Sequence, residues 1–109
     1  MAALKKTGTR VRGSSTGRPV MALLDLLGRR WTLRIVWELR EAPLTFRALQ
    51  EAAGGISPSV LNARIGDLYT AALIRQTDNG YALSDLGHEL ITKFLPLAAW
   101  SEKWASKIG

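Results

Sequence analysis

Four polar residues in the middle of the chain, Ser57, Ser59, Asn62 and Arg64, have side chains suited to recognition of a nucleic acid. Hydroxyl groups can donate to phosphates or bases, an amide can read adenine, and a guanidinium can bind guanine or phosphate. At helical spacing the outer face carries Ser59, Asn62, Ala63 and Gly66, and the buried side carries Val60, Leu61, Ile65 and Leu68. The pattern predicts a recognition helix over residues 57–71, with a compact polar face for the major groove.

The start of this helix is well marked, because Ser57 can cap it and Pro58 fits its first turn. Both are therefore candidate DNA-contacting residues. Arg64 lies at the margin of the polar face, and it can instead hold a phosphate or pair with Asp67 or Asp25. By itself such a helix is more typical of an ordinary solvated surface, and only the segments around it favour DNA contact.

The flanking segments supply that context. A short helix over residues 46–53 ends at Gly54-Gly55, just before the predicted recognition helix. Strands over residues 73–77 and 81–83 flank Asp78-Asn79-Gly80, where the Asn-Gly pair indicates a type I′ hairpin. Helix, turn, helix and hairpin within residues 46–83 define a winged helix-turn-helix. The expected fold class is mainly α with a small β-hairpin.

Further candidate DNA contacts surround this motif. Thr45 can cap the helix over residues 46–53 and form a phosphate clamp with Arg47. Arg75 lies on the predicted hairpin and Asn79 at its tip. Arg18 lies in Gly17-Arg18-Pro19, which resembles the core of an AT-hook, although Pro19 also suits the start of a helix. Seven arginines gather over this part of the chain, and four acidic residues partly oppose them: Arg29, Arg30, Arg34, Arg40, Arg47, Arg64 and Arg75, against Glu38, Glu41, Glu51 and Asp67.

Three other helices complete the predicted domain, over residues 19–27, 30–40 and 84–107, with Ser84 as a cap and Pro96 as a bend or interruption. The last helix carries an apolar stripe that is too long for so small a core to cover. Its first half can pack within the protomer, and its second half predicts dimerisation through the first and last helices. The candidate interface residues are Val20, Leu24, Leu90, Phe94, Leu97, Trp100 and Trp104.

The composition narrows the function classes. Of the net charge of +6, the first 18 residues contribute five basic and no acidic side chains. We expect a flexible basic arm over residues 1–18, which can remain solvated or bind DNA phosphates, and one domain over residues 19–109. The chain has no cysteine, which excludes thiol sensing and disulfides. Without an apolar run of membrane-spanning length, a cytoplasmic protein without membrane contact is expected.

The sequence offers little for catalysis. His88 is the only histidine, and its place beside Glu89 indicates a surface residue. No carboxylate cluster suggests a metal site, and no glycine-rich loop suggests a bound nucleotide. We therefore expect no enzyme, no cofactor, no metal and no catalytic residue.

The chain resembles the HxlR family of bacterial winged-helix transcription regulators, within the MarR-like group, over about residues 19–104. The resemblance is carried by Leu27-Gly28-Arg29-Arg30-Trp31-Thr32-Leu33, Phe46-Arg47-Ala48-Leu49, Ile56-Ser57-Pro58, Leu61, Arg64, Leu68, the segment from Tyr81 to Gly87, and Trp100. It implies a homodimer joined through the first and last helices, which binds double-stranded DNA at a pseudo-palindromic operator.

The chain departs from the family pattern in three places. Arg18 stands where members often have a sensing cysteine. The hairpin is shorter than the usual wing, which favours the basic arm as a second DNA contact. Ala72 stands where the family usually has glycine, and this alters the entry into the first strand.

Two alternatives to a DNA-binding regulator remain open at this stage. A winged-helix protein-interaction module would use the four tryptophans at an interface and bind no specific DNA. A regulator that also senses a small apolar effector would hold it among the aromatic residues of the dimer helices.

Overall fold

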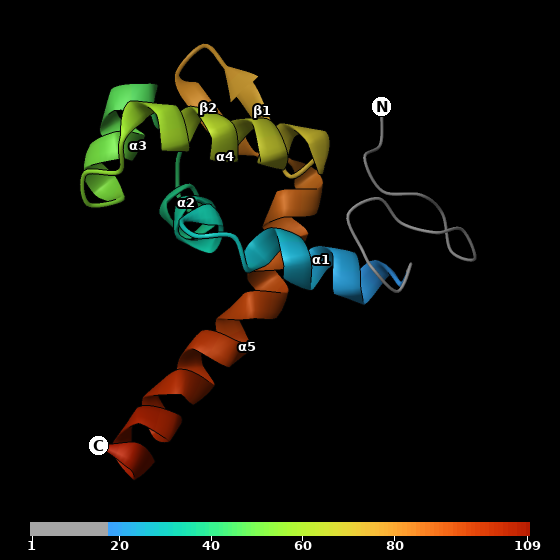
Figure 1. The fold of residues 1–109 in the computed structure, drawn as a ribbon, viewed down its shortest axis with the longest axis vertical. Coiled ribbons are helices and arrows are strands. Elements are labelled where there is room, and N and C mark those ends of the chain that lie inside the picture. Colours follow the sequence, from blue (N-terminus) through green and yellow to red (C-terminus); the bar gives the residue numbers. More distant parts are fainter. Residues whose placement is uncertain (1–17) are drawn as a thin grey trace.

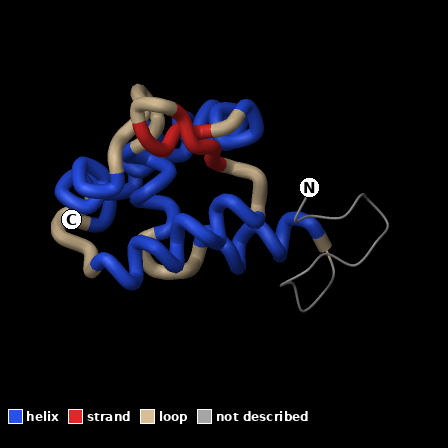
Figure 2. The backbone as a smooth tube through the Cα atoms, turned by 90° about the horizontal axis from the view of Figure 1, so that it is seen from above, coloured by secondary structure: helices blue, strands red, loops and turns tan. Residues whose placement is uncertain are grey.

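The computed structural model describes residues 18–109 as five helices and one hairpin (Figure 1). The elements in chain order are α1 (Pro19–Leu27), α2 (Thr32–Glu38), α3 (Phe46–Ala52), α4 (Pro58–Thr70), β1 (Ile74–Thr77), β2 (Gly80–Leu83) and α5 (Asp85–Ile108). Helices α3 and α4 and the hairpin lie together, while α5 extends away from them to the C-terminus (Figure 1). In the view from above, the two strands lie to one side of the helices (Figure 2).

One apolar core joins α2, α3, α4 and the hairpin. Its fully buried members include Ile35 and Leu39 of the α2 region, Leu49 of α3, and Leu61 and Leu68 of α4. Within α4 the buried positions recur at spacings of three and four residues, as expected for a helix with one inward side. The predicted inward side was wrong at Val60, which is 37% exposed. Val60 lies one turn before Arg64 and shares its position at the edge of the helix.

Helix α2 is shorter than the predicted span of residues 30–40, because the backbone turns sharply before it. Trp31 precedes the helix with a φ of +79°, in the left-handed region that bulky residues rarely adopt. Its indole packs against the core, and the guanidinium carbon of Arg30 lies 5.4 Å from the ring centroid. The turn thus separates α1 from α2 while it keeps Trp31 at the core boundary.

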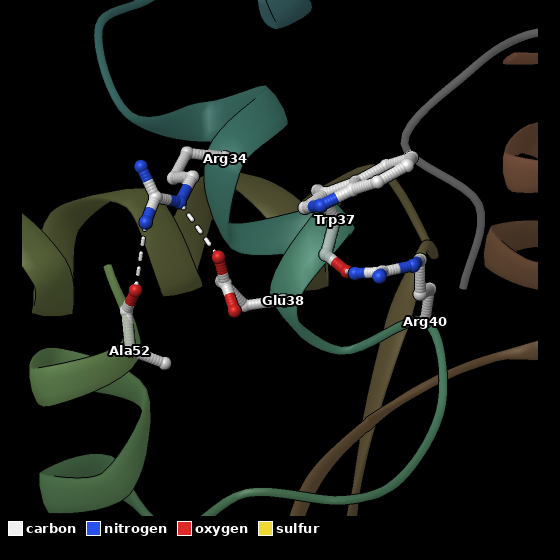
Figure 3. Close-up of polar contacts among 5 residues, drawn as sticks. All are labelled: Arg34, Trp37, Glu38, Arg40 and Ala52. Carbon is white, nitrogen blue, oxygen red and sulfur yellow. Dashed lines mark hydrogen bonds and ion pairs between the residues drawn. The ribbon is translucent and has the colours of Figure 1, made fainter. Parts of the chain in front are cut away.

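Two arginines of the α2 region fix neighbouring elements (Figure 3). Arg34 donates to Glu38 (2.7 Å) and to the carbonyl of Ala52 (2.8 Å), so that it joins α2 to the C-terminal end of α3. The guanidinium of Arg40 lies over the Trp37 ring at 3.9 Å and donates to the Trp37 carbonyl (3.0 Å). Trp37 in turn makes an edge-to-face contact with Phe94 of α5, at 5.9 Å between ring centroids. These side chains hold α2, α3 and α5 in place.

The predicted helix caps are confirmed. The hydroxyl oxygens of Thr45, Ser57 and Ser84 accept from the backbone N–H groups of the first turns of α3, α4 and α5. Gly54 and Gly55 end α3 at φ values of +89° and +87°. Their N–H groups donate to the carbonyls of Glu51 and Gln50, which closes the helix end.

The hairpin is short, as predicted, and a third segment supports it. Strands β1 and β2 pair antiparallel from Ile74↔Leu83 to Thr77↔Gly80. Leu44 forms an isolated antiparallel bridge with Tyr81, with mutual backbone hydrogen bonds of 2.9 and 2.8 Å. This bridge ties the entry of α3 to the hairpin.

The predicted type I′ turn is wrong. That turn needs positive φ at both central residues, whereas the positive φ in this turn falls on Gly80 (+119°) and not on Asp78 or Asn79. A Cβ on Gly80 would collide with the Leu44 carbonyl. Glycine is therefore needed at this position for the close approach of Leu44 as well as for the positive φ of the turn. The Thr77 hydroxyl accepts from the Asn79 N–H and donates to the Gly80 carbonyl, which closes the loop.

Of the bend or interruption expected at Pro96, the interruption is not found, because helix α5 runs through this residue and covers 24 residues. Near its start Gly87 is buried, and Ile91 belongs to the core. Leu90 and Phe94 are half-buried within the protomer, whereas Leu97, Trp100 and Trp104 are at least half exposed. The apolar stripe therefore divides, as predicted, into a packed first part and an uncovered second part, although Leu86 at its beginning is also exposed.

Candidate nucleic-acid interface

The outer face of α4 is polar, small and uncovered within the protomer. Ser59, Asn62, Ala63 and Gly66 are all exposed, at the spacing that places them on one side of the helix. A Cβ built on Gly66 meets nothing within 4 Å, so this face is open there. Only short side chains would separate the backbone of α4 from a partner lying along it.

The amino-terminal end of α4 is held in position by two polar contacts. The Ser57 hydroxyl accepts from the Val60 N–H (3.3 Å), and Pro58 occupies the first turn. One residue earlier, the Ile56 carbonyl accepts from the Gln50 side chain (2.9 Å), which joins the turn to α3. Ser57, Pro58 and Ser59 are therefore exposed at a helix end whose backbone is fixed.

Arg64 is turned toward Asp67 and not toward the open face. Its Nε lies 3.1 Å from Oδ2 of Asp67, and its side chain is 24% exposed. Arg29, from the turn after α1, approaches the other carboxylate oxygen at 3.0 Å. Of the alternatives for Arg64, pairing with Asp67 is the one found in this structure. The contribution of Arg29 comes from a distant part of the chain, which periodicity cannot reveal.

The candidate contacts around α4 are exposed but are not gathered into one pocket. Arg47 is almost fully solvated and lies 3.8 Å from Glu51, while the Thr45 hydroxyl oxygen accepts from the Ala48 N–H (3.1 Å). Arg75 and Asn79 are exposed on the hairpin. Thr45 and Arg47 lie at the start of α3, and Arg75 and Asn79 lie on the hairpin, which are the elements before and after α4 in the chain.

The arginine-rich region is largely committed to internal contacts. Arg29, Arg34, Arg47 and Arg64 pair with carboxylates, and Arg30 and Arg40 lie over tryptophan rings. The cluster predicted from the sequence is therefore not a uniform basic surface. Sequence reasoning missed the packing roles of Arg34 and Arg40, which depend on Ala52 and on the Trp37 ring face.

The amino-terminal candidates lie at the limit of the described residues. Residues 1–17, which include Gly17 of the AT-hook-like tripeptide, lie outside them. Arg18 precedes α1, and its carbonyl accepts from the Met21 and Ala22 N–H groups. Pro19 occupies the first helical position, which is the competing role expected for it.

A second uncovered surface is apolar and belongs to α1 and α5. Val20 and Leu24 of α1 are 56% and 54% exposed, and Leu97, Trp100 and Trp104 of α5 are 55%, 54% and 50% exposed. Large apolar side chains at helical spacing rarely stay open to water on a small protein. The C-terminal part of α5 projects away from α4 and the hairpin (Figure 1).

The three-helix arrangement of α2, α3 and α4 with the attached hairpin defines a winged helix-turn-helix, the architecture of many transcription regulators. The profile of the HxlR-like helix-turn-helix family matches residues 26–108. The chain belongs to this family, and it is a transcriptional regulator of the HxlR and MarR type.

Individual relatives agree with this assignment. An uncharacterized HTH-type transcriptional regulator, YdzF of Bacillus subtilis, is 29% identical over 75% of this chain and 83% of its own length. The quinone-bound YodB of B. subtilis is 26% identical, with a TM-score of 0.71 over 77% of this chain and 96% of YodB. A possible HxlR family transcriptional factor from Thermoplasma volcanium is also 26% identical, with a TM-score of 0.70 over 82% and 86% of the two chains.

Membrane-spanning helices and metal-binding clusters are both absent from the described part of the chain. No helix within residues 18–109 is long and apolar enough to cross a membrane. Over the same residues, no three histidine or acidic side chains gather as a group that could hold a metal ion.

Proposed function

We propose that this chain is a homodimeric, sequence-specific DNA-binding transcription regulator that inserts α4 into the major groove. The observation that carries the proposal is the open face of Ser59, Asn62, Ala63 and Gly66. Asn62 can read adenine through two hydrogen bonds, and the serine hydroxyls can bind bases or phosphates. The fixed first turn of α4 supports this use, because base recognition needs a helix end with little freedom.

Phosphate contacts on both sides of α4 would set its register on the duplex. Arg47 and Thr45 are suited to one flank, and Arg75 and Asn79 of the short hairpin to the other. Ser57 and Pro58 lie between them at the start of α4. Arg64 contributes from the margin, with its Nε engaged by Asp67.

The proposed dimer brings two copies of α4 to successive turns of a pseudo-palindromic operator. Val20 and Leu24 of α1, with Leu97, Trp100 and Trp104 of α5, would form the centre of the interface. Leu90 and Phe94 are half-buried in the protomer and would contribute at its edge. Covering this surface would remove several large apolar side chains from water. The hydrophobic free energy of this burial would be substantial for a chain with so small a core.

Selection of bound DNA from a random library with the purified full chain tests the proposal. We expect a two-fold symmetric site, and Asn62→Ala should weaken binding to it by about tenfold or more. Thr92→Ala, at an exposed position on α5, is the control and should bind as the wild type does. Enrichment of no site, or indifference to Asn62→Ala, would favour the alternative of a protein-interaction module.

We also propose that the basic amino-terminal arm supplements the short wing, with Arg18 at its end and the other basic residues outside the described part of the chain. Deletion of residues 1–17 should weaken DNA binding and flatten its salt dependence, by about 0.9 in the logarithmic slope for each phosphate that the arm neutralises. Binding with an unchanged slope would overturn this proposal.

We also propose that a small apolar molecule acts as an effector, and the quinone-bound form of YodB supports this proposal. Because this chain has no cysteine, such a response would use no thiol. Trp100 and Trp104 would report an apolar ligand at the dimer helices through their fluorescence. Titration with quinones should quench or shift that fluorescence, and a flat response would argue against quinone binding at this place.

A further inference from the structure

The carboxylate of Asp67 joins two parts of the protein with different proposed tasks. Asp67 lies on α4, one turn after Ala63 and at the margin of the open polar face. Its Oδ1 lies 3.0 Å from Nη1 of Arg29, which follows α1, and its Oδ2 lies 3.1 Å from Nε of Arg64 on α4 itself. One acidic group thus connects the recognition helix to the end of the helix that carries Val20 and Leu24.

The backbone of Arg29 is fixed between α1 and α2. Its N–H donates to the Leu26 carbonyl (3.2 Å), and its carbonyl accepts from the Thr32 N–H (3.1 Å). Thr32 is completely buried, and Trp31 between them adopts the left-handed backbone conformation. Arg29 therefore cannot shift without α1 and the start of α2.

The bridging pair of Arg29 and Asp67 is closer and less exposed than the pair on α3, although the Arg29 side chain is itself 45% exposed. The side chain of Asp67 is 23% exposed, and its Oδ2 and the Nε of Arg64 are closed to solvent and interact as an ion pair without a hydrogen bond between them. By contrast, Arg47 and Glu51 are 89% and 73% exposed and lie 3.8 Å apart. Charges that are partly shielded from water are screened less by salt than exposed charges, so the Arg29–Asp67 pair should hold its geometry better than the pair on α3.

We propose that the cluster of Arg29, Asp67 and Arg64 is a positioning device that sets the orientation of α4 relative to α1. In a dimer joined through α1 and α5, that orientation fixes the separation of the two recognition helices. Asp67 and Arg29 would thereby determine which half-site spacing is accepted, without touching the DNA. The inference rests on the proposed function, because it needs a dimer that binds two half-sites.

The test uses the full chain and operators in which the half-sites selected by the wild type are separated by stepwise changes of one base pair. The wild type should prefer one spacing. Arg29→Met and Asp67→Asn should each lose about tenfold in affinity at that spacing and discriminate less against its neighbours. The logarithmic salt slope should not change, because no phosphate contact is removed.

Two matched variants serve as controls. Arg30→Met removes the same charge at the adjacent position, away from Asp67, and should leave the spacing preference unchanged. Arg47→Met removes a proposed phosphate contact and should lower the salt slope by about 0.9 while the spacing preference is retained. Arg29→Lys keeps the charge, and it should recover part of the preference that Arg29→Met abolishes.

The outcomes separate the possible failures. If the wild type selects no symmetric site, the proposed function itself fails. If the wild type binds and Arg29→Met keeps its full preference, the positioning role is overturned. Equal losses of affinity at every spacing would also overturn the positioning role. With a lower salt slope they would identify Arg29 as a phosphate contact, and with an unchanged slope as a purely structural residue. Should Asp67→Asn not fold, Arg29→Met at the more exposed end carries the test.

Discussion

The backbone N–H of Leu73 donates to the carbonyl of Leu68 at 3.0 Å, so that the end of α4 closes back on itself before the first strand begins. Ala72, between them, donates to the Tyr69 carbonyl (2.9 Å) and adopts a φ of +63°. This double closure needs a left-handed residue, for which glycine is the usual choice. Both Leu68 and Leu73 are buried, so the strained alanine is held by the core on either side.

Ala72→Gly should therefore stabilise the protein. Relief of left-handed strain is worth about 1–2 kcal/mol, and the greater freedom of glycine in the unfolded chain offsets about 0.5–1 kcal/mol of it. The free energy of unfolding from urea titration should rise by up to about 1.5 kcal/mol. Ala71→Gly, at the preceding position without positive φ, should lower it instead. A decrease for Ala72→Gly would contradict the strain argument.

Gly87→Ala should destabilise the protein, because a Cβ there would collide with the carbonyl oxygen of Leu73 and lie 3.1 Å from the Leu83 side chain. The backbone at Leu73 cannot move aside as the end of a flexible side chain can. We therefore expect a loss of about 1–3 kcal/mol in the free energy of unfolding. Thermal unfolding would measure it. Gly66→Ala, on the open face of α4, is the matched control, and an equal loss in both variants would refute the packing argument.

Gly66→Ala has a second use, since stability and DNA binding should respond in opposite directions. In open space, alanine should raise the free energy of unfolding by about 1 kcal/mol through its helix propensity. If α4 lies close against DNA, larger residues at this position should weaken binding progressively, which a series of Ala, Leu and Gln variants would reveal in binding assays. Equal affinity across the series would exclude close approach at Gly66.

Ser57→Ala should lower the stability of the protein, whereas Ser59→Ala should lower its affinity for DNA. Ser57 caps α4, so its loss should cost about 1 kcal/mol in the free energy of unfolding. Ser59 is exposed on the open face of α4, so its replacement should leave stability almost unchanged and act on DNA affinity. Paired unfolding and binding measurements would separate the two roles, and an equal loss of stability in both variants would count against this division.

Trp104→Glu should dissociate the proposed dimer, because it introduces a charge into the exposed apolar stripe of α5. Sedimentation should show a monomer, and the unfolding temperature should lose its dependence on protein concentration. Lys103→Glu alters charge at the adjacent position outside the stripe, and it is expected to leave the dimer intact. A monomeric wild type would remove the basis of this prediction.

The sequence was sufficient for the features that depend on neighbours in the chain. Caps at Thr45, Ser57 and Ser84, the glycine end of α3 and the outer face of α4 all follow from hydrogen bonds and periodicity over three or four residues. Such interactions are local, so residue type and spacing determine them. The exposed stripe of α5 was equally readable, because a core formed by 109 residues cannot cover it.

Only the tertiary structure decided which distant residues meet. The Arg29–Asp67 contact, the bond from Arg34 to Ala52 and the bridge between Leu44 and Tyr81 join positions remote in sequence. They engage Arg29 and Arg34 of the arginine-rich cluster in internal contacts, and the close approach of Leu44 requires a glycine at position 80, where the positive φ of the hairpin falls. Periodicity predicts the face of a helix or strand on which a residue lies. The partner of a charged side chain and the backbone conformation of a turn depend as well on the segments that pack against that face.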